Sequence, residues 1–233
     1  TDAPNAVNGL LDVSLRGEGT LAESVTDRYA QESRPKVDVL WCVDNSSGMG
    51  PHQQVLADRF MNHLEQLWID YQVGVVTTEI NEAGRGPTGD MIYPGVLFQR
   101  IGYPRIIANR PPPGAGPAYQ PVNADRRAAF SANAMPGVCC SDEREACMEA
   151  VRLALSDPSI DDDQANKGFL RQGSTLVIAM LSDEDDQSPG SVEYYSSFLK
   201  GLKAGDPARL RLSIIAEFER EGTGANPPKP KAC

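Results

Sequence analysis

Apolar runs of strand length alternate with stretches of helical periodicity from Val37 onward. The runs that predict strands cover residues 37–43, 72–77, 175–181 and 210–218. The stretches with apolar residues three or four positions apart, which predict helices, cover residues 52–68, 143–155 and 192–202. This order is typical of an α/β, Rossmann-like doubly wound fold, with a mostly parallel sheet and helices on both faces. Trp41 and Trp68, at a strand and a helix position, are expected in its core.

Three segments interrupt or flank the alternation. Residues 84–137 are rich in Pro and Gly and predict a long insertion with a hairpin near residues 91–101. Residues 10–20 contain one short alternating strand, which resembles the closing strand of an immunoglobulin-like module and also suits an edge strand of the main sheet. We therefore divide the chain into an N-terminal strand and linker (1–35), one domain (36–220) and a Pro-rich linker (221–233).

The charge and the apolar runs exclude two classes of partner. The chain has 32 acidic and 22 basic residues, a net charge of -10 and a pI near 4.7. This is the wrong sign for a surface that neutralises phosphates, so we expect no nucleic acid partner. The longest apolar runs have strand length and fall short of the roughly 20 residues of a membrane helix, so we expect no membrane-spanning segment.

The cysteines indicate an oxidising compartment. Cys42 lies inside an apolar strand and is expected as a buried free thiol. With no C-x-x-C pair and only two His, neither a zinc site nor a redox dithiol is expected. The remaining cysteines are disulfide candidates: Cys139, Cys140, Cys147 and Cys233. We predict that Cys147 pairs with Cys139 or Cys140, which would suit an extracytoplasmic protein.

Two predicted strands end in carboxylates. One runs into Asp44-Asn45-Ser46-Ser47-Gly48-Met49, and another runs into Ser182-Asp183-Glu184-Asp185-Asp186. Because the carboxyl ends of parallel strands meet at one edge, Asp44, Ser46 and Asp183 are expected to converge, with Thr77 and Thr78 at the border. Two carboxylates and a hydroxyl are hard oxygen ligands that suit Mg²⁺, Mn²⁺ or Ca²⁺. The alternative for Asp44 is a carboxylate that caps its own loop through backbone amides. Asp185 and Asp186 are expected in a solvated loop.

These motifs resemble a von Willebrand factor A domain over about residues 36–220. The resemblance rests on the strand followed by Asp-x-Ser, the amphipathic helix after it, and the later strand that ends in Ser-Asp. It is similar to versions found in bacterial exported and surface proteins. It implies a metal-ion-dependent adhesion site, with a divalent cation held by Asp44, Ser46 and Asp183.

The chain also departs from the family pattern. Gly48 stands where the family has a Ser ligand, and Ser47 appears one position early. The family's Thr ligand should precede the helix over 143–155, where Ser141 is the candidate. The alternative for Ser141 is a helix N-cap, followed by an acidic first turn that contains Glu145.

The resemblance implies a non-catalytic extracytoplasmic module in which the metal accepts a carboxylate from a partner protein, for adhesion or assembly. The alternative is a metal-free structural subunit of a larger envelope or surface assembly. A metal-assisted hydrolase using Asp44 and Asp183 is a third reading. The sequence has no nucleophile elbow paired with His, no H-E-x-x-H, no P-loop and no G-x-G-x-x-G after a strand, so we expect no enzyme. We also expect the chain to belong to a longer protein or complex.

Overall fold

A computed structural model describes residues 10–12, 28–30, 34–81, 83–110, 123–138, 145–156 and 165–216. The chain divides into two compact units, Thr1–Pro35 and Lys36–Cys233. In the first unit, β1 (Leu10–Asp12) pairs antiparallel with β2 (Arg28–Ala30). The sequence predicted one strand here, as the closing strand of an immunoglobulin-like module or as an edge strand of the main sheet, and in the structure its hydrogen-bonded neighbour is β2.

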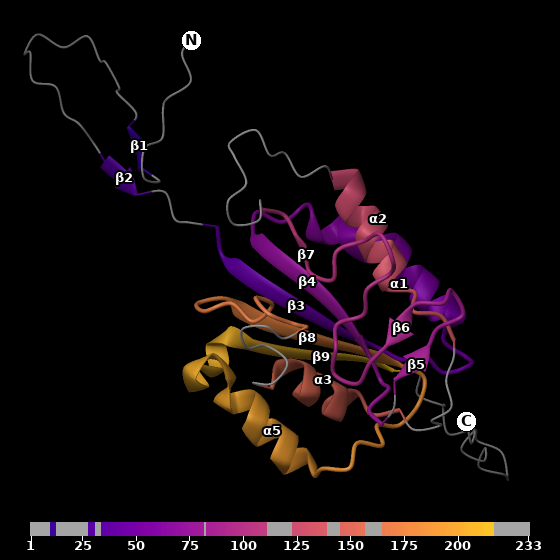
Figure 1. Ribbon diagram of the computed structural model, residues 1–233. Helices are drawn as coiled ribbons and strands as arrows, with labels where there is room; N and C mark the ends of the chain where they lie inside the picture. Colours follow the sequence, from indigo (N-terminus) through magenta and orange to yellow (C-terminus); the bar gives the residue numbers. More distant parts are fainter. Residues whose placement is uncertain are drawn as a thin grey trace, which may run out of the picture. The chain divides into compact units, whose positions relative to one another are not determined.

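The second unit is built on a five-stranded sheet with the order β7-β4-β3-β8-β9 (Figure 1). Its strands are β3 (Lys36–Val43), β4 (Asp70–Thr77), β7 (Ile107–Ala108), β8 (Thr175–Ser182) and β9 (Leu210–Ala216). The pairs β4-β3, β3-β8 and β8-β9 are parallel, and only β7 runs antiparallel, against β4. Within this register Val43 lies opposite both Thr77 and Leu181, so three strands end at the same level.

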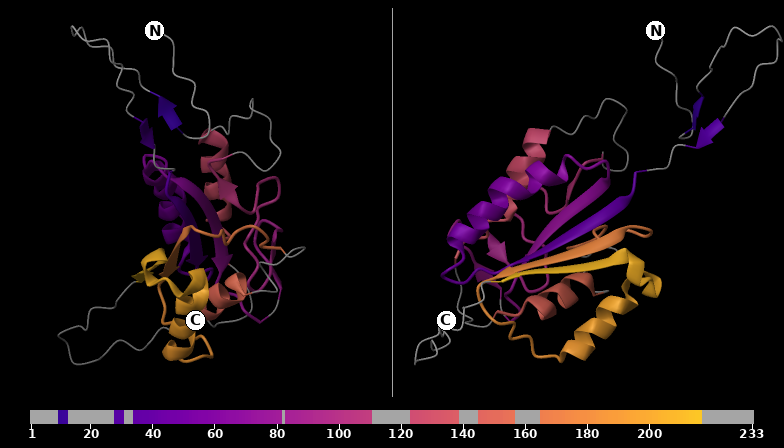
Figure 2. Two further views of the ribbon diagram at one scale, coloured as in Figure 1. Left: turned by 90° about the vertical axis from the view of Figure 1, so that its left-hand side faces the viewer. Right: turned by 180° about the vertical axis from the view of Figure 1, so that it is seen from behind.

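Helices cover both faces of this sheet, as Figure 2 shows. One face carries α1 (Gly50–Leu64) and α2 (Asn123–Asn133), and the other carries α3 (Cys147–Leu155) and α5 (Val192–Gly201). Two short 3-10 turns, Leu202–Gly205 and Pro207–Arg209, connect α5 to β9. The predicted α/β fold with a mostly parallel sheet is confirmed. In the described ranges no helix is both long and apolar enough to cross a membrane.

The alternation of side chains along β3 divides the core into two layers. Val39, Trp41 and Val43 pack with α1 and α2, whereas Leu40 and Cys42 pack with α3. The Trp41 ring meets the Phe60 ring edge to face, with centroids 5.2 Å apart. The prediction for Trp68 was wrong, because α1 ends at Leu64 and leaves Trp68 beyond the helix, 51% exposed.

The predicted insertion over residues 84–137 is partly wrong. Its hairpin pairs β5 (Gly84–Arg85) with β6 (Met91–Ile92), earlier than expected. The segment also contains β7, an edge strand of the central sheet, and α2, which buries Phe130 completely. A strand of two residues is too short to show apolar periodicity, so only tertiary packing reveals β7. The helix α2 is amphipathic and buries Ala129 and Phe130, a pattern that the prediction of an insertion overlooked.

Candidate functional site

The structure brings the loops after β3 and β8 together at the carboxyl edge of the sheet. The Asp44 amide donates to the Leu181 carbonyl at 2.9 Å, which ties the two strand ends. The Asp44 side chain is fully buried. Its Oδ1 accepts the Ser46 amide at 2.7 Å, and its Oδ2 accepts the Ser182 hydroxyl at 2.6 Å. Asp44 therefore caps its own loop, as one of the two readings of this residue predicted.

Asp183 reaches the same point from the other loop. The Ser46 hydroxyl donates to Asp183 Oδ1 at 3.4 Å, while the Ser46 amide binds Asp44. Ser46 thus connects two carboxylates that are 139 positions apart in the sequence. The predicted convergence of these three residues is confirmed. Their role as metal ligands stays a prediction.

Gly48 touches Asp183 directly. A Cβ atom at position 48 would lie 2.3 Å from Asp183 Oδ2, far inside van der Waals contact. Asp183 therefore occupies the space that a side chain at position 48 would need. Ser47 is exposed in the turn between Ser46 and Gly48. Gly48, which replaces the Ser of the motif that the sequence resembles, thus leaves space that the Asp183 carboxylate occupies.

Glu145 completes the site and was missed by the sequence reasoning, which placed it in the first turn of a helix. The helix α3 begins only at Cys147, and Glu145 lies before it, 5% exposed. The Thr78 hydroxyl lies within hydrogen-bond distance of the Glu145 carboxyl and 3.1 Å from Asn45 Oδ1. Thr78 thus borders the site as expected. One feature of the sequence could have pointed to Glu145. It lies near the start of the helix predicted over 143–155, where the resemblance placed a third oxygen ligand.

The first turn of α3 is capped from the β8–α5 loop, and Ala146 at its N-cap position supplies no side-chain hydrogen bond. Asp186 Oδ1 accepts the Met148 amide at 3.1 Å, and the Ser188 hydroxyl accepts the Glu149 amide at 2.9 Å. The Glu145 carbonyl accepts the Gln187 amide at 2.6 Å. Asp185 and Asp186 are exposed, as expected for a solvated loop, and Asp186 also holds α3 to the loop that carries Asp183.

The site holds more negative charge than it compensates. Burial and, after it, the neighbouring Asp44 carboxylate raise the pKa of Glu145 to about 8. Burial and the charges of Asp44 and Asp183 also raise the pKa of Glu184. Of the ion pairs formed within the described ranges, none includes these four residues. Carboxylates that crowd without a counter-charge are the electrostatic environment a divalent cation would stabilise.

The oxygen atoms of these side chains suit a hard cation, but they are too few to fill its coordination shell. Among the described residues, no three His, Cys, Asp or Glu side chains form a group that could hold a metal ion. A cation at Asp44 and Asp183 would therefore need hydroxyl oxygens and water to complete its shell. Mg²⁺ commonly keeps several waters in this way.

Several predicted residues lie outside the described ones: Ser141, Cys139, Cys140 and Cys233. Cys147 is described, and its thiol is free and buried. The predicted pairing of Cys147 with Cys139 or Cys140 is wrong in this structure, because Cys147 starts α3 on the face that packs on β3. There Cys147 belongs to the same buried cluster as Cys42. Cys42 is a buried free thiol, as predicted.

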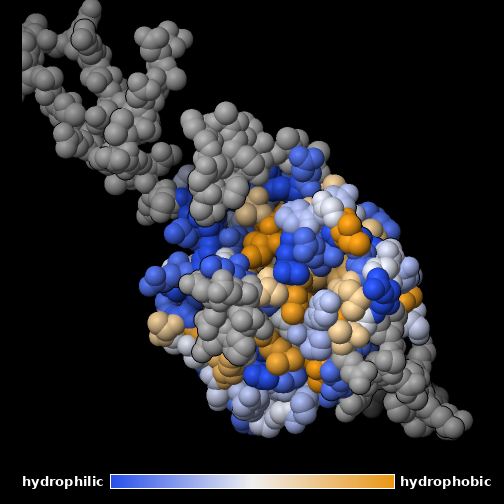
Figure 3. Space-filling model, in the orientation of Figure 1, coloured by the Kyte–Doolittle hydropathy of each residue, from blue (hydrophilic) through white to orange (hydrophobic). Residues whose placement is uncertain are grey.

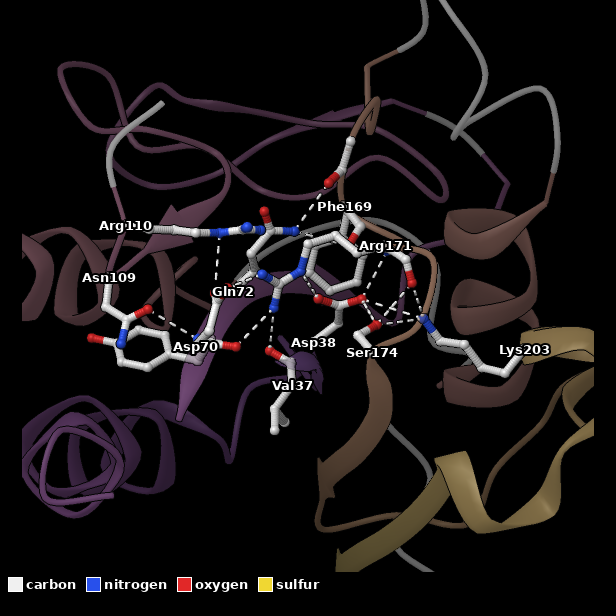
Figure 4. A network of polar contacts seen from close by, with 12 residues as sticks. Val37, Asp38, Asp70, Gln72, Asn109, Arg110, Phe169, Arg171, Ser174 and Lys203 are labelled. Carbon is white, nitrogen blue, oxygen red and sulfur yellow. Dashed lines mark hydrogen bonds and ion pairs between the residues drawn. The ribbon is translucent and has the colours of Figure 1, made fainter. Parts of the chain in front are cut away.

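A second polar constellation lies at the opposite, amino-terminal edge of the sheet (Figure 4). Asp38, fully buried in β3, accepts the Arg171 amide at 2.8 Å and the Arg171 Nε at 2.5 Å. Lys203 Nζ lies 3.3 Å from the same carboxylate and donates to Ser174 Oγ at 2.7 Å. Arg171 also bonds Asp70 at 2.7 Å. Its buried charges are paired with one another, so this network fixes strand ends and loops.

Comparisons with known proteins add little to this geometry. No protein-family model matches the chain, and a search of curated proteins finds no match. Among solved structures, the chain is similar to proximal thread matrix protein 1 (PTMP1) from the mussel byssus, with 14% identity and a TM-score of 0.41. The match covers 78% of this chain and 36% of that protein, so the chain spans about a third of its length. The function has to be argued from the residues.

Proposed function

We propose that this chain is a non-catalytic protein-binding module of the von Willebrand factor A type, whose carboxyl sheet edge binds a divalent cation. The observation that supports this is the convergence of Asp44, Ser46 and Asp183, beside a Glu145 carboxyl with a pKa of about 8. Mg²⁺, Mn²⁺ or Ca²⁺ would lower the repulsion between these groups. The resemblance in sequence motifs suggests the family, and the parallel strand order suits it.

In this proposal Asp44, Ser46 and Asp183 hold the cation together with water. The cation supplies an electrophilic position that accepts a carboxylate oxygen from an acidic partner protein. The domain's own residues position the ion. Ser182 and the Ser46 amide orient Asp44, while Gly48 leaves room for Asp183. The role would be adhesion or assembly outside the cytoplasm, within a larger chain or complex.

A second candidate function keeps the fold without the metal. The hydroxyls of Ser46 and Ser182 already donate to Asp183 and Asp44, so the edge has an internal set of hydrogen bonds that needs no ion. In that case the chain is a structural subunit of a surface assembly. Metal dependence separates the two functions.

The test is calorimetric titration of EDTA-treated protein with Mg²⁺, Mn²⁺ and Ca²⁺. The site variant is Asp183→Asn, and the matched control is Asp58→Asn, which removes an exposed carboxylate from α1. We expect saturable binding with a stoichiometry near one for the wild type and the control, and at least about tenfold weaker binding for Asp183→Asn. No saturable binding would overturn the metal proposal in favour of the structural subunit. Equal affinity in Asp183→Asn would show that the cation binds elsewhere and would overturn the assignment of this site.

A further inference from the structure

A second candidate site lies in residues 84–105, in side chains that the metal edge does not use. A cavity of about 300 Å³ is formed by the β5–β6 hairpin and the loop that follows it. Its lining includes two guanidinium groups and several apolar side chains: Arg85, Met91, Tyr93, Val96, Ile101 and Arg105. This volume is at the lower end of the range for small-molecule sites.

The one acidic residue of the lining, Asp90, is neutralised from within the same loop. Asp90 Oδ2 lies 3.1 Å from Arg100 Nη1 and accepts the Thr88 hydroxyl. Its Oδ1 accepts the Ile101 amide at 2.8 Å. These donors hold the pKa of Asp90 below its usual value although burial opposes them. The charge of Asp90 is therefore compensated before any ligand enters.

The two guanidinium groups of the lining are bonded only to carbonyl oxygens among the described residues. Arg105 donates to the carbonyls of Leu97 and Ala165, both at 2.9 Å. Arg85 donates to the Gly89 carbonyl at 2.5 Å. Burial lowers the pKa of Arg105, because its charge is partly removed from water. Neither group forms an ion pair with a carboxylate of the described ranges.

Two guanidinium groups without a carboxylate partner among the described residues are unusual for a chain with a net charge of -10. A guanidinium has five N–H donors, and the bonds above use two on Arg105 and one on Arg85. Donors therefore remain on both side chains. A planar fork of this kind matches a carboxylate, which can accept two parallel hydrogen bonds.

The cavity wall is held in place by two buried asparagines. Asn166 accepts the Leu97 amide at 2.8 Å and donates to the Gly95 carbonyl at 2.7 Å. Asn133 accepts the Arg100 amide at 3.0 Å and donates to the Pro104 carbonyl at 2.9 Å. A loop fixed at four backbone groups can bind a ligand with little loss of conformational entropy.

Apolar side chains stand beside these charges. Ile101 is 79% exposed and Tyr93 is 46% exposed, and both line the cavity. On the face drawn in Figure 3, apolar residues lie in small groups between polar ones and form no broad patch. Such a surface suits a compact ligand better than a large apolar interface.

We propose that this cavity binds a carboxylate attached to an apolar group. Arg85 and Arg105 would hold the carboxylate, and Tyr93, Val96 and Ile101 would contact the apolar part. Two sources present this chemistry: a free organic acid, or the C-terminal carboxylate of a hydrophobic peptide. Since no proposed metal ligand lines the cavity, the site is independent of the function proposed above.

The experiment uses the full chain in EDTA, so that divalent cations do not contribute. Amide chemical shifts are followed during titration with 3-phenylpropionate and with its neutral amide. A second arm uses a Gly-Gly-Leu-Leu peptide with a free C-terminus and the same peptide amidated. We expect saturable shifts at residues 85–105 with each acid, and at least about tenfold weaker binding of each neutral partner. The acid that binds more tightly identifies the source.

Three variants test the assignment of residues. Arg85→Gln and Ile101→Ser change exposed side chains, so both are expected to fold and to weaken binding of the preferred acid at least about fivefold. Arg59→Gln, which removes an exposed guanidinium from α1, is the control and should bind as the wild type does. Absence of saturable shifts, equal affinity for acid and amide, or unchanged affinity in Arg85→Gln would each overturn the proposal.

Discussion

Glu145→Gln should change how the stability of this protein depends on pH. In the wild type, the buried Glu145 carboxyl lies beside the Asp44 carboxylate, and its pKa is raised from 4.5 to about 8. The folded state therefore binds one more proton than the unfolded state between these two values. The contribution of Glu145 to the free energy of unfolding is therefore complete below pH 4.5. It decreases as the pH rises and is lost once the pH has passed about 8. Gln at position 145 stays neutral and removes this dependence.

The pKa difference sets the size of the effect. One pKa unit corresponds to about 1.4 kcal/mol, so a change from 4.5 to about 8 corresponds to roughly 5 kcal/mol between pH 4 and pH 9. Other titrating groups are shared by both proteins and largely cancel in the difference. We therefore expect Glu145→Gln to gain several kcal/mol relative to the wild type between pH 5 and pH 9.

The assay is urea unfolding of both proteins at pH 5, 7 and 9 in EDTA, with Glu193→Gln as the control. Glu193 is exposed on α5 and its pKa is lowered by hydrogen bonds at the helix start, so its difference from the wild type should stay constant over this range. A constant difference for Glu145→Gln as well would refute the argument from burial and repulsion.

Three further outcomes follow from named contacts. Gly48→Ala should displace Asp183, whose Oδ2 would lie 2.3 Å from the new Cβ, and weaken Mn²⁺ binding about tenfold with a stability loss of about 1 kcal/mol; unchanged calorimetric affinity would contradict it. Arg171→Met should cost about 3 to 5 kcal/mol in urea unfolding, because it removes a partner of buried Asp38; a loss under about 1 kcal/mol would show that the remaining partners suffice. Burial raises the pKa of Cys42 well above its usual value, so iodoacetamide should label it slowly in the native protein and rapidly in urea; rapid native labelling would disagree.

The sequence by itself determined the layered fold and the convergence of Asp44, Ser46 and Asp183, but not the place of Glu145. Continuous apolar runs such as 37–43 predict strands buried on both faces. Helical periodicity between these runs predicts helices that cover the two faces of a mostly parallel sheet. The rule that parallel strands end together was enough to bring Asp44 and Asp183 to one edge. Both conclusions follow from local pattern combined with a general rule of parallel sheets, so neither requires knowledge of a particular contact between distant side chains.

Tertiary structure decided what depends on contacts between distant segments. The place of Glu145 beside Thr78 follows from where α3 begins, and that start is capped by Asp186 from another loop. The place of β7 at the edge of the sheet arises from its pairing with β4, because a strand of two residues shows no pattern of its own. The free thiol of Cys147 faces Cys42 because the first turn of α3 packs on β3. A sequence pattern records which side chains can be buried, whereas only the folded chain decides which distant groups meet.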